Sequence, residues 1–228
     1  MYAILAILII IQGNFGEVYR GIYKGTNVAI KICRADATEF EVTKKFLAGE
    51  TTALNFKHPN IVQLIGIAVR SYPIMIVMEY VENGSLLSYL RDTKNDINVD
   101  LLARMSADAA AGMAYLESKL CIHRDLAARN CLVTKSIRIK IADFGMSREN
   151  DVYVLFETSK NVFPTQLSNH TDQIPIKWTS PEALSTGRYT IKCDIWSYGV
   201  LLWEIFSCGK TPYQDMDNKK TRELIEKG

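Results

Sequence analysis

Residues 122–130 read IHRDLAARN, and this stretch decides the fold. It places three charged side chains and an asparagine inside an apolar neighbourhood. Asp125 and Asn130 are five residues apart, a spacing that lets both face one site from a short loop. A carboxylate held in this way is suited to accept the proton of a hydroxyl group. The stretch therefore predicts a reactive loop rather than a surface loop with ordinary capping residues.

A second motif, IADFG at residues 141–145, follows closely. It supplies Asp143, followed by Phe144 and the flexible Gly145. The carboxylate of Asp143 and the carboxamide of Asn130 are hard oxygen ligands of the kind that Mg²⁺ prefers. Together, and in this order, the two motifs predict a magnesium site beside the residue that accepts the proton.

The run VAIK at residues 28–31 has the composition of a β-strand. Ala29 and Lys31 lie on the same face of such a strand, because side chains alternate with a period of two. The small Ala29 leaves room for a flat base, and the ammonium group of Lys31 can reach phosphate oxygens. For this motif alone, a solvated lysine in an edge strand is the plain alternative.

Residues 9–21, IIIQGNFGEVYRG, predict a glycine-rich hairpin that closes over the phosphates of a nucleotide. In the pattern G-x-G-x-x-G the last two glycines are Gly13 and Gly16, but the first position holds Ile11. Isoleucine is tolerated there in a β conformation, and it costs about 1–2 kcal/mol if the position needs a positive φ. We therefore expect nucleotide affinity to be weakened but not lost.

The composition is that of an ordinary globular protein, long enough for one large domain or two lobes with separate cores. Of 228 residues, 48% are hydrophobic, and the net charge of +2 gives no indication of a nucleic-acid surface. The five cysteines form no C-x-x-C pair, which favours free thiols in a reducing compartment. The apolar residues 2–11 are too few for a membrane span, which needs about 20 residues, and they predict a strand.

The pattern of apolar residues divides the chain into a β-rich part up to about residue 80 and a mainly helical part after it. In the first part we expect strands within residues 15–35, a helix over 39–56 and strands over 61–69 and 73–80. In the second part we expect helices over 85–91 and 100–119, short strands within 121–145 and a buried helix over 191–208.

These motifs, in this order, resemble those of a protein kinase, and the resemblance extends over residues 10–228. The AAR sequence before Asn130 and the stretch PIKWTSPEAL at residues 175–184 are similar to tyrosine kinases. The stretches GNFGEV, HPNIV, DAAAGMAYLESK, CIHRDLAARNCLVT and DFGMSRE are similar to the Fes/Fer group of cytoplasmic tyrosine kinases. The resemblance implies an α+β, two-lobed protein-kinase fold over residues 1–228, with a β-rich N-lobe at 1–80 and a mainly helical C-lobe at 81–228.

The resemblance also implies that this C-lobe lacks its last helices. Glu182 of the Ser180-Pro181-Glu182 motif would then be a buried carboxylate without the arginine that pairs with it in the family. For the same reason, we expect apolar side chains of the helix over 191–208 to be partly exposed, among them Trp196, Leu202, Trp203 or Phe206.

Roles for the site residues follow from the resemblance. Asp125 would orient the tyrosine hydroxyl of the substrate and take its proton, while Arg129 would hold charge near the transferring phosphoryl group. Lys31 would hold the α- and β-phosphates of ATP, and Asn130 and Asp143 would bind Mg²⁺. The ATP site would comprise a gatekeeper, Met78, and further residues that line the phosphates and the base: Ile10, Gly13, Asn14, Phe15, Gly16, Val18, Ala29, Lys31, Glu79, Val81 and Leu132.

The acidic partner of Lys31 is expected on the helix over 39–56, but the spacing is off by one residue. Counting back from His58 without gaps, the glutamate of the family falls on Gly49, and Glu50 is next to it. The family has a large apolar residue four positions later, where Glu50 has Leu54 and Gly49 has only Ala53. This difference favours Glu50 as the catalytic partner of Lys31, with a gapless alignment on Gly49 as the alternative.

Tyr153 stands where the activating tyrosine of the family lies, and its phosphate would pair with Arg124. The segment 154–174 that follows is longer than in Fes/Fer relatives and has no clear periodicity. We expect it to form a loosely packed loop.

Two functions follow from these features. The first is a cytoplasmic, non-receptor protein-tyrosine kinase that uses ATP and Mg²⁺ on tyrosine-containing protein substrates. It needs no nucleic acid and no transmembrane span, although a full-length relative is expected to be able to associate peripherally with membranes. The second is a kinase-like binding module with weak or no turnover, which Ile11, the long segment 154–174 and the missing helices favour.

Overall fold

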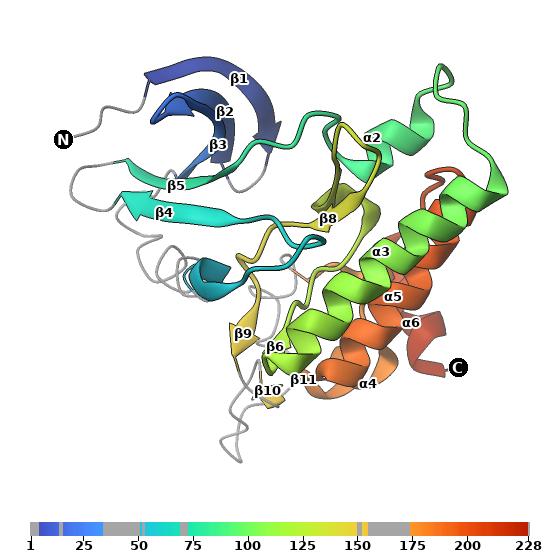
Figure 1. Cartoon of the computed structure of the whole chain (residues 1–228). Helices are drawn as coiled ribbons and strands as arrows, with labels where there is room; N and C mark the ends of the chain where they lie inside the picture. Colours follow the sequence, from blue (N-terminus) through green and yellow to red (C-terminus); the bar gives the residue numbers. More distant parts are fainter. Residues whose placement is uncertain are drawn as a thin grey trace.

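The structure, a computed structural model, describes residues 5–13, 16–33, 51, 53–68, 73–149, 152–154 and 174–227. Within these ranges, the backbone alone is described for residues 5–13, 16, 33, 148, 149 and 152–154. The chain has a sheet-rich N-lobe and a mainly helical C-lobe (Figure 1), which confirms the two-lobed α+β fold predicted from the sequence.

The N-lobe is built on one antiparallel sheet with the strand order β1-β2-β3-β5-β4. Its strands are β1 (Leu5–Gly13), β2 (Gly16–Tyr23), β3 (Thr26–Cys33), β4 (Leu64–Ala68) and β5 (Ile74–Glu79). Strands β3 and β5 are rich in valine and isoleucine, which pack well on a pleated surface. Val28, Ile30 and Val77 form a small buried cluster on one face, so β3 is held between β2 and β5.

The first hairpin has the geometry that the glycine-rich motif predicts. Gly13 pairs with Gly16 next to its turn, and Ile11 pairs with Val18. Ile11 therefore lies in a β-strand, the conformation in which a β-branched residue is tolerated.

The C-lobe contains the helices α2 (Leu86–Arg91), α3 (Val99–Ser118), α4 (Pro181–Thr186), α5 (Ile191–Phe206) and α6 (Asn218–Lys227). Polar caps explain where the first two begin. The side chain of Ser85 accepts a hydrogen bond from the backbone N–H of Ser88, and that of Asn98 accepts one from Leu101. Helix α4 ends at Thr186 and is followed by the capping residue Gly187, whose φ of 67° favours glycine.

Three two-stranded sheets carry the loops of the C-lobe. They pair β6 (Cys121–Ile122) with β9 (Arg148–Glu149), β7 (Cys131–Val133) with β8 (Ile139–Ile141), and β10 (Val152–Val154) with β11 (Arg188–Thr190). Helices α3 and α5 lie side by side in Figure 1 and pack against each other. Their buried side chains, among them Met105, Ala109, Leu201 and Ile205, belong to one hydrophobic core.

Gly112 allows α3 to approach the strand that leads to Asp143. A Cβ atom at this position would lie 2.8 Å from the backbone oxygen of Asn60 and 2.8 Å from Cδ1 of Ile141 on β8. A side chain here would therefore push α3 away from β8.

For the C-lobe, the sequence predicts exposed apolar side chains on α5 and a buried Glu182, and the structure shows only the first. The prediction of an exposed apolar face on α5 is confirmed, since Trp196, Trp203 and Phe206 are 37%, 46% and 52% exposed. The expectation that Glu182 is buried is wrong, because Glu182 lies exposed in the first turn of α4. Its carboxylate accepts a hydrogen bond from the thiol of Cys193 over 3.5 Å.

The segment after Asp143 also differs from the expectation in one part. Tyr153 lies in strand β10 and pairs with Tyr189 of β11, and Val154, the first residue of the expected loop, is the last residue of this strand. Residues 155–173 lie outside the described residues.

The prediction of free thiols is confirmed where cysteine side chains are described, while the reducing compartment stays a prediction. Cys121, Cys131 and Cys193 are buried free thiols, and Cys208 is an exposed one. Burial raises the pKa of the Cys131 thiol well above its usual range, with a smaller contribution from the nearby Glu204 carboxylate. In the described part of the chain, none of the helices is both long enough and apolar enough for a transmembrane span.

Candidate active site

The IHRDLAARN stretch forms a loop between β6 and β7 that is held in place by hydrogen bonds to α5. Asp194, which is 1% exposed, accepts hydrogen bonds from the backbone N–H groups of His123 (2.7 Å) and Arg124 (2.9 Å). Burial raises the pKa of Asp194, and the charges and N–H groups of His123 and Arg124 oppose that rise. Because Arg124 has a φ of 70°, the loop turns sharply just before Asp125.

Asp125 is held on both sides by residues of its own loop. Nδ2 of Asn130 donates to the backbone oxygen of Asp125 (2.7 Å) and to its Oδ2 (2.8 Å). The guanidinium group of Arg129 forms an ion pair with Oδ1. Burial raises the pKa of the Asp125 carboxyl group, and the positive charge of Arg129 is the largest influence that opposes this rise. The structure therefore brings Asp125, Arg129 and Asn130 together as predicted.

Lys31 and Asp143 meet across the two lobes. Nζ of Lys31 lies 2.8 Å from Oδ1 of Asp143, and Lys31 is 7% exposed. Burial alone would raise the pKa of Asp143. The charge and the hydrogen bond of Lys31, together with His123 and the backbone N–H of Gly145, lower it by more. The pKa of Asp143 therefore lies below its ordinary value.

Aromatic contacts join the IHRDLAARN and IADFG motifs to the N-lobe. The ring of Phe144 lies 5.3 Å from that of His123 and 5.9 Å from that of Phe56. One ring nitrogen of His123 is 3.0 Å from the backbone oxygen of Ala142. Asp143 lies between Ala142 and Phe144, so both of its chain neighbours are fixed by packing or hydrogen bonding.

The predicted base-binding residues converge where β3, β5 and β7 meet. Ala29 pairs with Met78 across β3 and β5. Met78 and Leu132 pack against one buried cluster, which contains Val81. For Ile10, Gly13 and Gly16 the backbone places the residues in the first hairpin. Asn14 and Phe15 lie outside the described residues.

The partner expected for Lys31, Glu50, also lies outside the described residues. The premise that favoured it is wrong, however, because Leu54 is 37% exposed whereas Ala53 is 1% exposed. These residues form a 3₁₀ turn, Ala53–Asn55, rather than a continuing α-helix, so an offset of four no longer identifies the buried face. Glu50 stays a prediction.

The linker between the lobes is tied to both of them. Oε1 of Glu79 accepts hydrogen bonds from the backbone N–H of Gln63 (2.7 Å) and from Nζ of Lys140 (2.7 Å). Lys140 lies on β8, three residues before Asp143, so this contact connects β5 to the strand that leads to Asp143.

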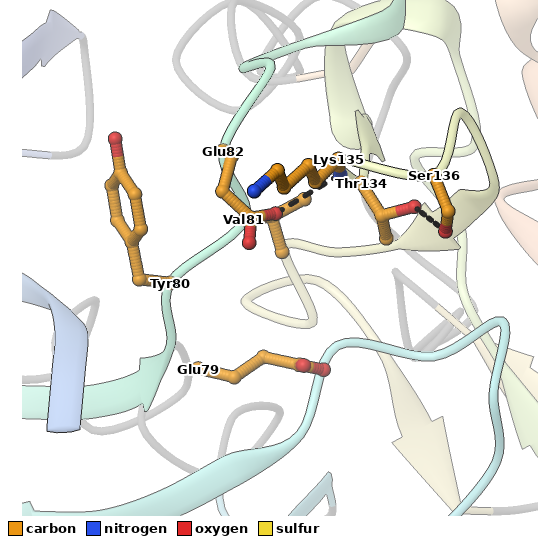
Figure 2. A pocket seen from close by; sticks show the side chains of 7 residues that line it. All are labelled: Glu79, Tyr80, Val81, Glu82, Thr134, Lys135 and Ser136. Carbon is orange, nitrogen blue, oxygen red and sulfur yellow. Dashed lines mark hydrogen bonds between the residues drawn. The ribbon is translucent and has the colours of Figure 1, made fainter.

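A pocket of about 520 Å³ lies beside this linker, between residues 79–82 and the turn at residues 134–136 (Figure 2). Oε2 of Glu82 accepts a hydrogen bond from the backbone N–H of Lys135, with an N–O distance of 3.1 Å, and a dashed line marks this bond in Figure 2. The pocket lining includes Glu79 and Val81 but not Ala29 or Leu132, so it adjoins the predicted base site without coinciding with it.

The donor set fits a magnesium ion that arrives with a phosphate ligand. Both hydrogens of the Asn130 side-chain amide point to Asp125. The side-chain oxygen, Oδ1, is therefore left for another partner. The lowered pKa of Asp143 keeps its carboxylate anionic. In the part of the chain that the structure describes, no three His, Cys, Asp or Glu side chains form a metal cluster. Water or phosphate oxygens would have to complete the shell, as Mg²⁺ sites commonly require.

Comparison with known families agrees with this geometry. Residues 7–228 match the family model described as protein tyrosine and serine/threonine kinase. The chain belongs to the protein kinase family. It is 49% identical to human tyrosine-protein kinase Fer over 218 residues and 48% identical to the transforming protein Fps of Fujinami sarcoma virus over 219 residues. Each match covers 95% of this chain but only 25% and 24% of the relatives, so the chain spans about a quarter of their length.

The candidate site contains residues to which the sequence pattern assigned no role. Asp194 and Glu204 are buried acids on α5, and Trp178 lies at the end of a 3₁₀ turn, Ile176–Trp178. The sequence does indicate Asp194 and Glu204, since an acidic residue inside an apolar helix needs a buried hydrogen-bonding partner. The identity of those partners, which are 26 to 76 residues away in the chain, could not be read from the pattern.

Proposed function

We propose that this chain transfers the γ-phosphate of ATP to tyrosine hydroxyl groups of proteins. The observation that carries the proposal is the arrangement around Asp125, whose carboxylate is held by Asn130 on one side and Arg129 on the other. An orienting carboxylate of raised pKa, fixed beside a cation, is suited to receive a hydroxyl proton.

In the proposed reaction, the tyrosine oxygen bonds to the γ-phosphorus while the bond from this phosphorus to the bridging oxygen of ADP breaks. Asp125 receives the hydroxyl proton, and Arg129 stabilises charge on the transferring group. Lys31 would hold the α- and β-phosphates. When bound by Asn130 and Asp143, Mg²⁺ would neutralise phosphate charge. Catalysis then consists mainly of positioning and electrostatic stabilisation.

The choice of tyrosine over serine rests on Arg129 and on the similarity to relatives that are named tyrosine-protein kinases. The guanidinium group of Arg129 lies 4.2 Å from the centre of the Trp178 ring, so the two side chains form one wall beside Asp125. Such a cationic and aromatic surface can pack against the ring of a phenolic side chain, which a short aliphatic hydroxyl lacks. A cytoplasmic location and peripheral membrane association stay predictions.

We also propose that Tyr153 is a phosphorylation site that acts on the catalytic loop. Tyr153 pairs with Tyr189, and the guanidinium group of Arg124 lies 4.6 Å from the Tyr189 ring centre. A phosphate at this register position would lie close to Arg124, whose charge would stabilise it.

Transfer of radioactive phosphate to a poly-Glu/Tyr peptide tests the proposed function. Asp125→Asn is the control, because it keeps the size of the side chain and removes the proton acceptor. We expect incorporation with the unchanged chain and on the order of a hundredfold less with the variant. Equal incorporation by both proteins would contradict the proposal and favour a kinase-like binding module.

A further inference from the structure

Glu204 is a buried acid that bonds to two separate parts of the site. It lies on α5 and is 1% exposed. Its Oε2 atom accepts one hydrogen bond from the backbone N–H of Ala128 (2.9 Å) and another from Nε1 of Trp178 (2.9 Å). Ala128 belongs to the catalytic loop, and Trp178 belongs to the segment before α4, so one oxygen atom joins the two.

Both donors lie next to Arg129. Ala128 precedes Arg129 in the chain, and the ring of Trp178 lies under its guanidinium group at 4.2 Å. Arg129 in turn pairs with Asp125. The backbone and the aromatic support of Arg129 are therefore held by the same carboxylate, although Glu204 itself touches neither Asp125 nor Arg129 through a hydrogen bond.

The charge of Glu204 has a physical use in this arrangement. Burial raises the pKa of Glu204 and so disfavours its charged form. The hydrogen bonds from Trp178 and Ala128 and the positive charge of Arg129 oppose this rise. A neutral acceptor would satisfy the same two donors at lower cost. When Glu204 is ionised, its carboxylate accepts the hydrogen bond from the indole N–H of Trp178 and polarises the ring. The face of the ring becomes more negative and attracts the guanidinium group of Arg129 more strongly.

We propose that Glu204 is a positioning residue for the protein substrate: it fixes Trp178 and the catalytic loop so that Arg129 stays in place beside Asp125. This inference rests on the proposed function. It assigns Glu204 to the acceptor side of the reaction, whereas nucleotide binding is proposed to depend on Lys31, Asp143 and the linker, none of which forms a hydrogen bond with Oε2 of Glu204.

Two substitutions separate the parts of this arrangement. Trp178→Phe keeps an aromatic ring under Arg129 and removes the N–H that Glu204 accepts. Glu204→Gln keeps an acceptor oxygen for both donors and removes the charge. Trp203→Phe and Glu223→Gln are the matched controls, since Trp203 and Glu223 are exposed and lie outside the contacts that join Glu204, Trp178 and Arg129.

For the unchanged chain and for each variant, the measurements are kcat and KM for a tyrosine peptide, the Kd of that peptide by fluorescence anisotropy, the Kd of a non-hydrolysable ATP analogue and the melting temperature. We expect Trp178→Phe and Glu204→Gln each to lower kcat/KM for the peptide on the order of tenfold, with the ATP-analogue Kd unchanged within about twofold. We expect the double variant to lose less than the product of the two single losses, because both act on one contact.

A purely structural role gives a different result. It would lower the melting temperature and weaken nucleotide and peptide binding together, and that outcome would overturn the proposal. Peptide kinetics and peptide binding equal to those of the unchanged chain would overturn it as well. If Glu204→Gln does not fold, Trp178→Phe decides the question alone. Absence of transfer by the unchanged chain would contradict the proposed function, and the peptide-binding measurement would still decide the role of Glu204.

Discussion

Nζ of Lys31 lies 2.8 Å from Oδ1 of Asp143, although the two residues are 112 positions apart in the sequence. The contact joins the central strand of the N-lobe sheet to the IADFG motif of the C-lobe. It places the cation expected to hold ATP phosphates beside a carboxylate expected to hold Mg²⁺. A change at either residue is therefore expected to act on the other.

Replacing Lys31 by methionine should abolish phosphate transfer while the fold is kept. The variant loses the charge that would position the phosphates, which lowers kcat by orders of magnitude. The phosphate-transfer assay, together with circular dichroism, measures both effects, and Lys192→Met on the exposed side of α5 is the control. Near-normal turnover of the Lys31 variant would show that this lysine has been assigned the wrong role.

The pH dependence of transfer should respond to Arg129. Asp125 must be ionised to accept a proton, so activity falls as the pH drops through its pKa, which burial raises and Arg129 lowers. Removal of this cation in Arg129→Met raises the pKa of Asp125 further, and the acidic limb of kcat/KM should therefore move to higher pH. A limb that stays in place or moves to lower pH would contradict this electrostatic assignment. Arg104→Met, at an exposed position on α3, should leave the profile unchanged.

Tyr153→Phe should remove the increase in activity that prior incubation with ATP produces. Its phosphate is expected close to Arg124, at the register position opposite Tyr189. Rates measured before and after incubation, with phosphate sites located by mass spectrometry, test this expectation. The prediction fails if the phenylalanine variant is activated as strongly as the unchanged chain.

Asp194→Asn should destabilise the chain and reduce transfer together. Asparagine offers one acceptor oxygen, whereas Asp194 accepts from two buried backbone N–H groups, those of His123 and Arg124. Leaving one of them unsatisfied costs about 1–3 kcal/mol. Urea unfolding measures this loss, and Asp215→Asn at an exposed position should show none. Unchanged unfolding of the Asp194 variant would mean that water or another group replaces the carboxylate.

Sequence periodicity predicts the elements that have one clear repeat. The helices over 85–91, 100–119 and 191–208 and the strands around Lys31 are found within one or two residues of their expected bounds. Around Ala53 and Leu54, the prediction assumed the spacing of an α-helix, but the chain forms a 3₁₀ turn there. An error of one residue in such a turn exchanges the buried and exposed sides, so the offset could not identify the partner of Lys31.

The sequence by itself determined which chemically active residue types the proposed site contains. Asp125, Asn130 and Asp143 occur as specific residue types at short spacings, and a loop of a few residues can bring such neighbours together without help from distant segments. Only the tertiary structure decided which residues support them. The bonds of Glu204 to Ala128 and Trp178 span 76 and 26 residues. They exist because α5 packs under the catalytic loop, and a linear pattern of apolar residues shows that a helix is buried but not which donors its acids will meet.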